Sequence, residues 1–220
     1  MENGLRITCD DKTARPWILA NTDIGSMYER QVLVEYRNPR SVYVVAMNTF
    51  SIAVRIYTAK CEMEFQHFTI SSAAVQAATM AKKPSRSARK NPNTMMHVDH
   101  DASTCSVMDA ECTRVYPFTT VNFPEWRKLF NVDGHANHAL KSVVFDPVLF
   151  GNVTAAFGHG DITFLGGPDD HSPIVLVHTL GIGLIQPMWR GTEYTEPQRT
   201  LERVQTVLGS GKANDAQTKS

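Results

Sequence analysis

A short run of histidine and aspartate, His97-Val98-Asp99-His100-Asp101, is the one arrangement in the sequence that invites an enzymatic interpretation. In a β-strand alternate side chains share a face, so His97, Asp99 and Asp101 would point together and could hold a metal through nitrogen and oxygen atoms. A metal-dependent enzyme that uses His97, Asp99 and His100 is therefore a remote alternative. No second such cluster stands out, because the remaining histidines in expected loops are interpreted as plain surface residues, and we expect no resident metal: His135, His138, His159 and His171.

Motifs that would support other chemistry do not occur in the sequence. It contains no G-x-S-x-G, no phosphate-binding P-loop, no G-x-G-x-x-G and no H-E-x-x-H. We therefore predict that the protein is not an enzyme, that it has no catalytic residues and that it needs no cofactor.

A basic segment is the best local candidate for contact with nucleic acid. The 22 basic residues balance the 22 acidic ones, so the bulk charge argues for no such partner and only the local distribution can. Five basic residues stand close together with no acid among them: Lys82, Lys83, Arg86, Arg89 and Lys90. Arg15, near an expected helix, could add to this segment. Lys and Arg attract phosphates irrespective of base sequence, although such runs are usually solvated surface loops.

Composition bounds the class of protein. A chain of 220 residues suits one large or two small domains, and no apolar stretch approaches the ~18 to 20 residues that span a bilayer. The four cysteines are scattered and form no C-x-x-C pair, and the first residues do not resemble a secretory signal. We expect a cytoplasmic protein with free thiols and no membrane partner.

The elements that must position these residues follow a repeated order of one strand, one short helix and three strands. The order is clear over 62–121, and again over 140–189, where Asp146 and Pro147 form a specific helix start. A weaker copy has its helix at 16–25 and its three strands within 31–57. Units of one helix and an open antiparallel sheet favour assembly by edge pairing.

Three segments carry a resemblance to the bacterial beta sliding clamp, the processivity ring of DNA polymerase III. Val44–Val54 is similar to that family's V-A-T-D-G-H-R-L-A-V strand pair, with Thr49-Phe50-Ser51 where the family has G-H-R. Asn122–Leu129 resembles R-F-P-D-Y-R-R-V, which joins the middle domain to the last, and Leu184–Trp189 resembles the closing V-V-M-P-M-R strand. The resemblance covers roughly residues 16–190. It implies an α+β DNA-clamp fold, with antiparallel sheets outside and short helices lining the inside of a ring.

The repeat count sets an expectation for assembly. Residues 1–121 would form a clamp-like domain of two repeats, 122–134 a connecting segment, 135–190 a third repeat amounting to half a domain, and 191–220 a mobile tail. A clamp ring holds about twelve such repeats, so three per chain favour a head-to-tail homo-tetramer. A trimer is the alternative if 1–25 or the tail holds a fourth repeat.

The resemblance also implies a function in DNA replication. As a sliding clamp the protein would encircle duplex DNA through the basic residues above, and would bind a DNA polymerase and a clamp loader. An adaptor that binds replication proteins without forming a ring is the alternative, and the short, diverged chain suggests a phage or plasmid replicon within a bacterial cell. By position, the pocket for partner peptides would involve Met47, Thr49, Phe50, Ser51, Ile52, Pro124, Lys128, Leu129, Leu184, Gln186, Pro187 and Met188.

Overall fold

The computed structural model describes residues 5–8, 13–22, 30–38, 41–60, 66–80, 94–99, 102–108, 112–119, 122–130, 145–169 and 171–188. The strands are β1 (Leu5–Thr8), β2 (Gln31–Asn38), β3 (Ser41–Met47), β4 (Ser51–Lys60), β5 (Gln66–Ser71), β6 (Thr94–Asp99), β7 (Thr104–Met108), β8 (Thr113–Thr119), β9 (Ile162–Leu165), β10 (Ile174–His178) and β11 (Gly181–Ile185). The helices are η1 (Leu19–Asn21), α1 (Ser72–Met80), η3 (Trp126–Leu129) and α3 (Pro147–Phe157), where η denotes a 3-10 helix. In these ranges no helix combines the length and the apolar character that a membrane span requires.

The predicted repeats are present as three successive sets of elements. The first set is β1, η1 and β2–β4, the second is β5, α1 and β6–β8, and the third is α3 and β9–β11. The strand expected at 140–145 falls outside the described residues except for Phe145, which is not in a strand. The strand-helix-strands order predicted from the sequence is thus confirmed for the second set, and its helix and three strands for the third.

The helix predicted at 16–25 was wrong in type and extent. Within the described residues only the 3-10 turn η1 forms there, closed by the amides of Asn21 and Thr22, which donate to the carbonyls three residues earlier at 3.1 and 3.2 Å. Side-chain bonds hold this turn to other elements: Asn48 Nδ2 donates to Thr22 Oγ1 at 2.9 Å, and Ser72 Oγ donates to Asn21 Oδ1 at 2.7 Å. In addition, Thr22 Oγ1 donates to the Leu19 carbonyl at 2.8 Å, and a local side-chain bond of this kind offers the backbone an alternative to the α-helix.

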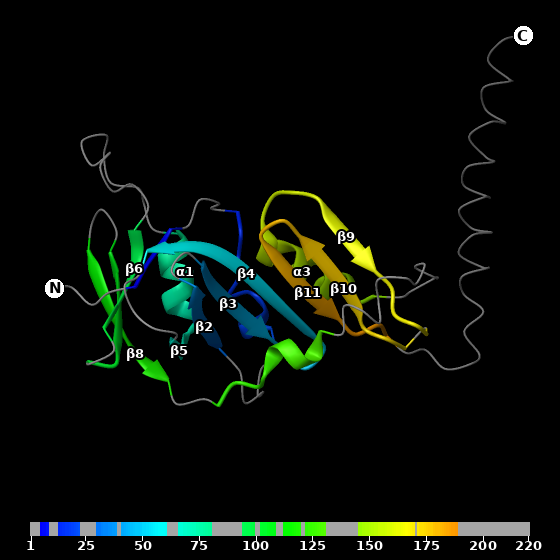
Figure 1. Cartoon of the computed structure of the whole chain (residues 1–220), viewed down its shortest axis with the longest axis horizontal. Coiled ribbons are helices and arrows are strands. Elements are labelled where there is room, and N and C mark those ends of the chain that lie inside the picture. Colours follow the sequence, from blue (N-terminus) through cyan, green and yellow to red (C-terminus); the bar gives the residue numbers. More distant parts are fainter. Residues whose placement is uncertain are drawn as a thin grey trace, which may run out of the picture.

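The first two repeats close on each other because each lends its first strand to the other. β1 pairs with β4 of its own repeat and with β6 of the second, while β5 pairs with β8 of its own repeat and with β2 of the first. All these pairings are antiparallel, and with the strand pairs inside each repeat they join eight strands into one closed sheet. The third repeat extends this sheet through pairing of β11 with β4, so the molecule is elongated (Figure 1).

The helix start predicted at Asp146 and Pro147 is confirmed. Asp146 is the N-cap, and its Oδ1 accepts from the amides of Val148 at 2.7 Å and Leu149 at 3.4 Å. Proline suits the first helical position because it has no amide hydrogen to leave unpaired there. Further along the helix, a Cβ on Gly183 would lie 2.7 Å from Val153 Cγ1, so only glycine lets α3 pack this closely on β11.

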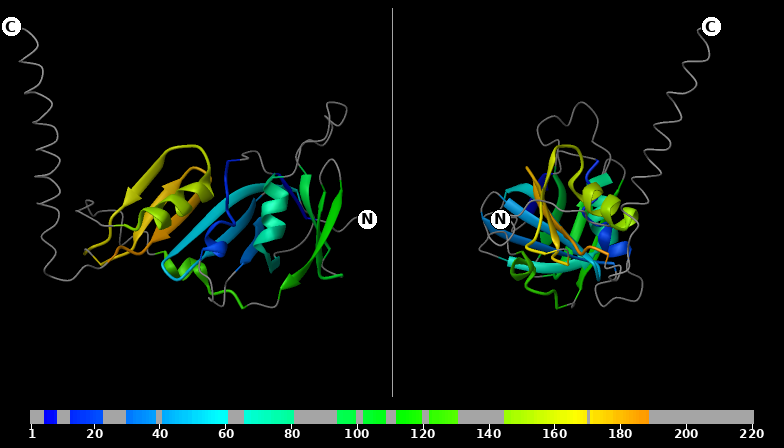
Figure 2. Two further views of the ribbon diagram at one scale, coloured as in Figure 1. Left: turned by 180° about the vertical axis from the view of Figure 1, so that it is seen from behind. Right: turned by 90° about the vertical axis from the view of Figure 1, so that its right-hand side faces the viewer.

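Two apolar cores lie on opposite faces of the sheet. The larger one joins α1 and α3 to the sheet, and both helices lie on the same face (Figure 2). The smaller one, here called the outer cluster, consists of Leu33, Val45, Ile52, Val54 and Trp126 with partly buried neighbours that include Met47 and Leu184. Along β4 the side chains alternate between them, Ala53 and Tyr57 in the larger core and Ile52 and Val54 in the outer cluster, as strand geometry requires.

A buried arginine holds the third repeat against the first. Arg55 of β4 is only 2% exposed, and its Nη1 donates to the carbonyl of Phe157 at the end of α3. The ring of His178 stacks on Phe157 with centroids 5.5 Å apart. The Leu180 amide donates to His178 Nδ1 at 3.1 Å, so Nε2 carries the hydrogen and donates to the His159 carbonyl at 3.1 Å. This network ties β4, α3 and β10 together.

Candidate partner-binding site

The turn between β3 and β4 is shaped by one buried asparagine. Asn48 Oδ1 accepts from the Phe50 amide at 3.0 Å, and from the amide and the hydroxyl of Ser51, both at 2.8 Å. The Asn48 amide also donates to the Ser51 carbonyl at 2.9 Å. These bonds fix the turn so that Phe50 projects outward with 56% of its surface exposed.

The end of β11 lies directly beside this turn. The Gln186 amide donates to the Phe50 carbonyl at 2.8 Å, and β11 pairs with β4 so that Leu184 is opposite Ile52. The Gln186 side chain donates from Nε2 to the His171 carbonyl at 2.8 Å. Two of the three segments singled out in the sequence are therefore side by side, although 130 positions of chain separate them.

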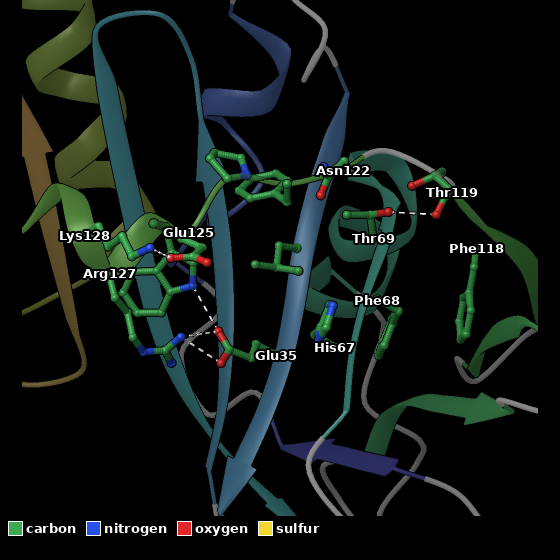
Figure 3. Close-up of a pocket in the computed structure, with 14 residues that line it drawn as sticks. Glu35, His67, Phe68, Thr69, Phe118, Thr119, Asn122, Glu125, Arg127 and Lys128 are labelled. Carbon is green, nitrogen blue, oxygen red and sulfur yellow. Dashed lines mark hydrogen bonds and ion pairs between the residues drawn. The ribbon is translucent and has the colours of Figure 1, made fainter.

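The third segment is held by a buried carboxylate. Glu35 of β2 is 5% exposed. Its Oε2 accepts from Trp126 Nε1 at 3.0 Å, and Arg127 Nη1 donates to Oε1 at 2.7 Å and to Oε2 at 2.6 Å (Figure 3). The Arg127 guanidinium lies over the Trp126 ring, 4.0 Å from its centroid. Trp126 in turn is buried in the outer cluster with Ile52 of β4. The carboxylate thus fixes η3 across the sheet, close to the other two segments.

The three segments that hold the predicted pocket residues each contribute side chains to the outer cluster, and the predicted residues differ in exposure. Ser51, Ile52 and Pro187 are buried, Met47 and Leu184 are half-buried against the cluster, and Pro124 is half-buried as well. Thr49, Lys128 and Gln186 are exposed polar residues, and Lys128 Nζ pairs with Glu125. Each segment also contributes one exposed large apolar side chain: Phe50 at 56%, Leu129 at 46% and Met188 at 43%. This is an apolar surface with an adaptable methionine, suited to a short peptide.

A cavity of about 800 Å³ lies beside η3, and its lining includes neither the β3–β4 turn nor the end of β11. Only Pro124 and Lys128 of its lining were predicted. The lining residues come from β2, β5, β8 and the connecting segment: Leu33, Glu35, His67, Phe68, Thr69, Phe118, Thr119, Asn122, Phe123, Pro124, Glu125, Trp126, Arg127 and Lys128 (Figure 3). Local spacing gives no signal for this set, because strand pairing brings it together. Phe68 and Phe118, for example, stack with centroids 4.5 Å apart.

The predicted DNA-contact residues are mostly not described. Lys82, Lys83, Arg86, Arg89 and Lys90 lie outside the described residues, and Arg15 alone is placed. Arg15 is exposed, and its amide donates to the Ala155 carbonyl of α3 at 2.8 Å, which sets it beside that helix. The helices η1, α1 and α3 themselves contain no charged residue.

The histidine-aspartate run is only partly described. His97 is half-buried and Asp99 exposed on β6, on the face opposite to the buried Met96 and Val98, and Asp99 Oδ1 accepts from the Ala102 amide at 3.0 Å. His100 and Asp101 lie outside the described residues. Within the part of the chain that is described, no three His, Cys, Asp or Glu side chains are grouped so that they could hold a metal.

Solved structures resemble this fold, although no protein-family model and no curated protein sequence matches the chain. The Helicobacter pylori beta clamp bound to a DNA ligase peptide has a TM-score of 0.60 at 9% identity over 86% of this chain and 66% of its own. The Pseudomonas aeruginosa DNA polymerase sliding clamp has a TM-score of 0.59 at 10% identity, over 86% and 67%. The putative DNA polymerase III beta subunit from Eubacterium rectale has a TM-score of 0.59 at 9% identity, over 86% and 66%.

This chain spans about two thirds of the length of those clamps. The protein has the fold of the bacterial DNA polymerase III beta sliding clamps.

Proposed function

We propose that the protein is a DNA sliding clamp, a processivity factor that surrounds duplex DNA and tethers replication proteins to it. The observation that carries the proposal is the continuous sheet in which one closed two-repeat domain is extended by a third repeat through β4 and β11. Clamp-fold units joined edge to edge in this way form an arc, and arcs joined by further edges form a ring. The protein is then a binding scaffold and not an enzyme.

DNA would be held by Lys82, Lys83, Arg86, Arg89, Lys90 and Arg15. Charge attraction to phosphates has no directional or sequence requirement, so a protein bound in this way can slide. Because η1, α1 and α3 have no charged residue, these six residues carry the DNA-contact proposal.

The ring would contain four copies of the chain. Three repeats per chain and about twelve per ring give four chains, and three chains would be needed if a fourth repeat lies outside the described residues. The half domain formed by the third repeat then completes itself only in the assembly.

Partner proteins would dock on the surface around the outer cluster. Phe50, Leu129 and Met188 supply exposed apolar contacts at three points, and Asn48 and Glu35 preorganise the turn and η3 that carry two of them. A short segment with Leu and Phe side chains is the expected ligand, because such side chains fill apolar slots between fixed elements. The H. pylori clamp with its DNA ligase peptide is an example of peptide binding by a protein of this fold.

Topological retention tests the proposal. The oligomer is dissociated in mild denaturant, allowed to reassemble in the presence of circular plasmid, and passed over a sizing column at high salt, which weakens phosphate contacts. A clamp remains with the circle and is released when a restriction enzyme linearises it. Release from the circle at high salt, by an oligomer of normal mass, would contradict encirclement.

An adaptor that binds replication proteins without a ring is the second candidate. The absence of charged residues from η1, α1 and α3 favours an adaptor, since a hole that surrounds DNA needs positive charge on its inner surface. An adaptor would bind the Leu/Phe peptide in the same way but would show no difference between circular and linear DNA.

A further inference from the structure

The N-terminal half of β8 is an exposed sheet edge. β7 pairs with Thr113–Pro117 on one side, while β5 reaches only Phe118 and Thr119 on the other. Among the described residues, no strand pairs with the outer side of Thr113–Pro117. Val115, in the middle of this stretch, is 63% exposed. An unpaired edge with an exposed β-branched residue is a template for pairing with another strand.

The fold itself shows what covers this kind of edge. β4 is the last strand of the first repeat, as β8 is of the second and β11 of the third, and β1 pairs with only the far end of β4, at Thr58–Lys60. The stretch of β4 that β1 does not reach is covered by β11, with Ser51–Arg55 antiparallel to Gly181–Ile185. In the one junction between repeats that the described residues form outside the closed domain, a last strand therefore pairs with a last strand.

We infer that β8 pairs antiparallel with β8 of a second copy of this chain, across a two-fold axis. Within the described residues β4 and β11 are already paired with each other, so the only last strand left to cover β8 is β8 itself. This inference rests on the proposed function, in which copies of the chain form a ring, and it specifies one of the contacts of that ring.

The hydrogen-bond pattern of β8 defines the register. The Phe118 amide donates to the Ser103 carbonyl of the β7 side at 2.9 Å, so the backbone groups of Arg114 and Tyr116 also face β7 and those of Thr113, Val115 and Pro117 face outward. With the axis at Val115, the two copies exchange a pair of Val115 bonds. The Thr113 amide of each copy then donates to the Pro117 carbonyl of the other. Pro117 has no amide hydrogen, so it accepts this bond and donates none in return.

Side chains agree with this register. Val115 packs against Val115 of the second copy, and Arg114 lies opposite Tyr116 of the second copy, where a guanidinium can stack on a phenol ring. No described residue of Thr113–Pro117 is acidic, and placing the axis at Arg114 instead would put two arginines opposite each other. The axis at Val115 avoids this repulsion.

The other open edge of the described sheet, that of β9, is of a different type. β9 corresponds to β2 and β6, which pair with first strands of the neighbouring repeat and not with last strands. Pairing β8 of one copy with β9 of the next would therefore follow neither of the pairings seen within the chain. This favours a ring with two-fold contacts over the head-to-tail ring expected from the repeat count.

Charge exchange at position 115 tests the two-fold contact on the protein alone, without DNA. Val115→Asp and Val115→Lys are each expected to halve the mass of the oligomer measured by light scattering, because the two-fold axis places two like charges opposite each other. An equimolar mixture of the two variants should restore the wild-type mass, and Val115→Thr, which is uncharged, should keep it. Circular dichroism checks that every variant remains folded, as the exposure of Val115 predicts.

Cross-linking gives an independent readout. Antiparallel residues that exchange hydrogen bonds have Cα atoms about 5.5 Å apart, within disulfide range. Mild oxidation of Val115→Cys should give a covalent dimer in which peptide mapping finds position 115 joined to itself. The native Cys112 thiols would be about 20 Å apart in this register and should not cross-link.

An unchanged mass for either charged variant, a mixture that stays dissociated, a monomeric wild-type protein, or no disulfide at position 115 would each overturn the inference. If these results occur while the protein is still retained on circular DNA, the clamp function stands and only the two-fold contact is wrong. If the disulfide forms but circular DNA is not retained, the contact stands and the clamp function fails.

Discussion

The two faces of β4 differ in what covers them. On the inner face, Ala53, Arg55 and Tyr57 are buried under helices, and Arg55 bonds to the end of α3. On the outer face, Ile52 and Val54 are covered by the short segment at η3, which is held by Glu35. The inner face therefore packs against whole helices in the larger core, whereas the outer face is an apolar surface covered by one short segment, where we propose that partners dock.

The largest expected effect comes from removing an inner aromatic side chain. Phe157 is fully buried and contacts β11, His178 and Arg55. Phe157→Ala should lower the free energy of unfolding by about 3–5 kcal/mol, because it loses apolar burial and leaves a cavity. Urea titration measures this loss. Val148→Ala on the same helix, at a position 66% exposed, is the control and should change stability by less than about 0.5 kcal/mol. Similar losses for the two variants would show that α3 is not packed as described.

The next largest effect is the pH dependence of stability that the buried thiol of Cys105 causes. Burial raises the pKa of Cys105 to about 12, from an ordinary value of 9.0 that holds in the unfolded chain. Between these values the unfolded chain has lost the thiol proton and the folded protein keeps it, so stability is full below pH 9 and falls as the pH rises, by up to about 1.4 kcal/mol per pH unit.

The measurement is the free energy of unfolding from pH 8 to 11, compared with a Cys105→Ala variant that lacks the titrating group. The difference between the two should shrink as the pH rises. In the folded protein at pH 8, alkylation should modify the exposed Cys112 and leave Cys105 intact. Modification of Cys105 under these conditions would show that the inner face is open to solvent.

Sequence patterns predicted the inner elements well because their signals are local. Asp146 and Pro147 mark the start of α3, and alternating β-branched residues mark β2–β4, so the strand-helix-strands order was visible without tertiary information. Where the prediction was wrong, at the helix expected over 16–25, hydrogen bonds between distant residues determine the structure. The η1 turn depends on Asn48 and Ser72, 26 and 51 positions away, and no spacing rule relates them.

The outer site was predicted only in part for the same reason. Its three segments were found through family resemblance, and the structure places all three around the outer cluster. The residue that fixes η3, Glu35, is 91 positions from Trp126 and stands among strand residues with no motif around it. A buried acid in a strand is a signal that could have been noticed, but its partner could not be named from the sequence.

A substitution of Glu35 tests whether this carboxylate holds η3 over the outer cluster. Glu35→Gln keeps an acceptor for Trp126 Nε1 but removes the charge that Arg127 meets, and should cost about 1–2 kcal/mol of stability, since the Arg127 side chain is 35% exposed and partly screened. Chemical denaturation measures it. Glu125→Gln, which breaks the exposed pair with Lys128, is the matched control and should cost nothing measurable. Equal losses would mean that Glu35 does not anchor η3.

The smallest effect on stability, and the sharpest on function, is expected at Phe50. Because 56% of its surface is exposed, Phe50 does not fill a slot itself and is available to a ligand. Phe50→Ala should leave the unfolding free energy within about 0.5 kcal/mol of wild type, yet weaken binding of a fluorescent Leu/Phe-containing peptide about five-fold, as loss of an aromatic contact does at the edge of an interface. Fluorescence anisotropy measures the affinity, with Val148→Ala on α3, at a position 66% exposed, as the control. Tighter binding by Phe50→Ala would mean that Phe50 blocks the surface, and an unchanged affinity would place the partner site elsewhere, with the cavity beside η3 as the next surface to test.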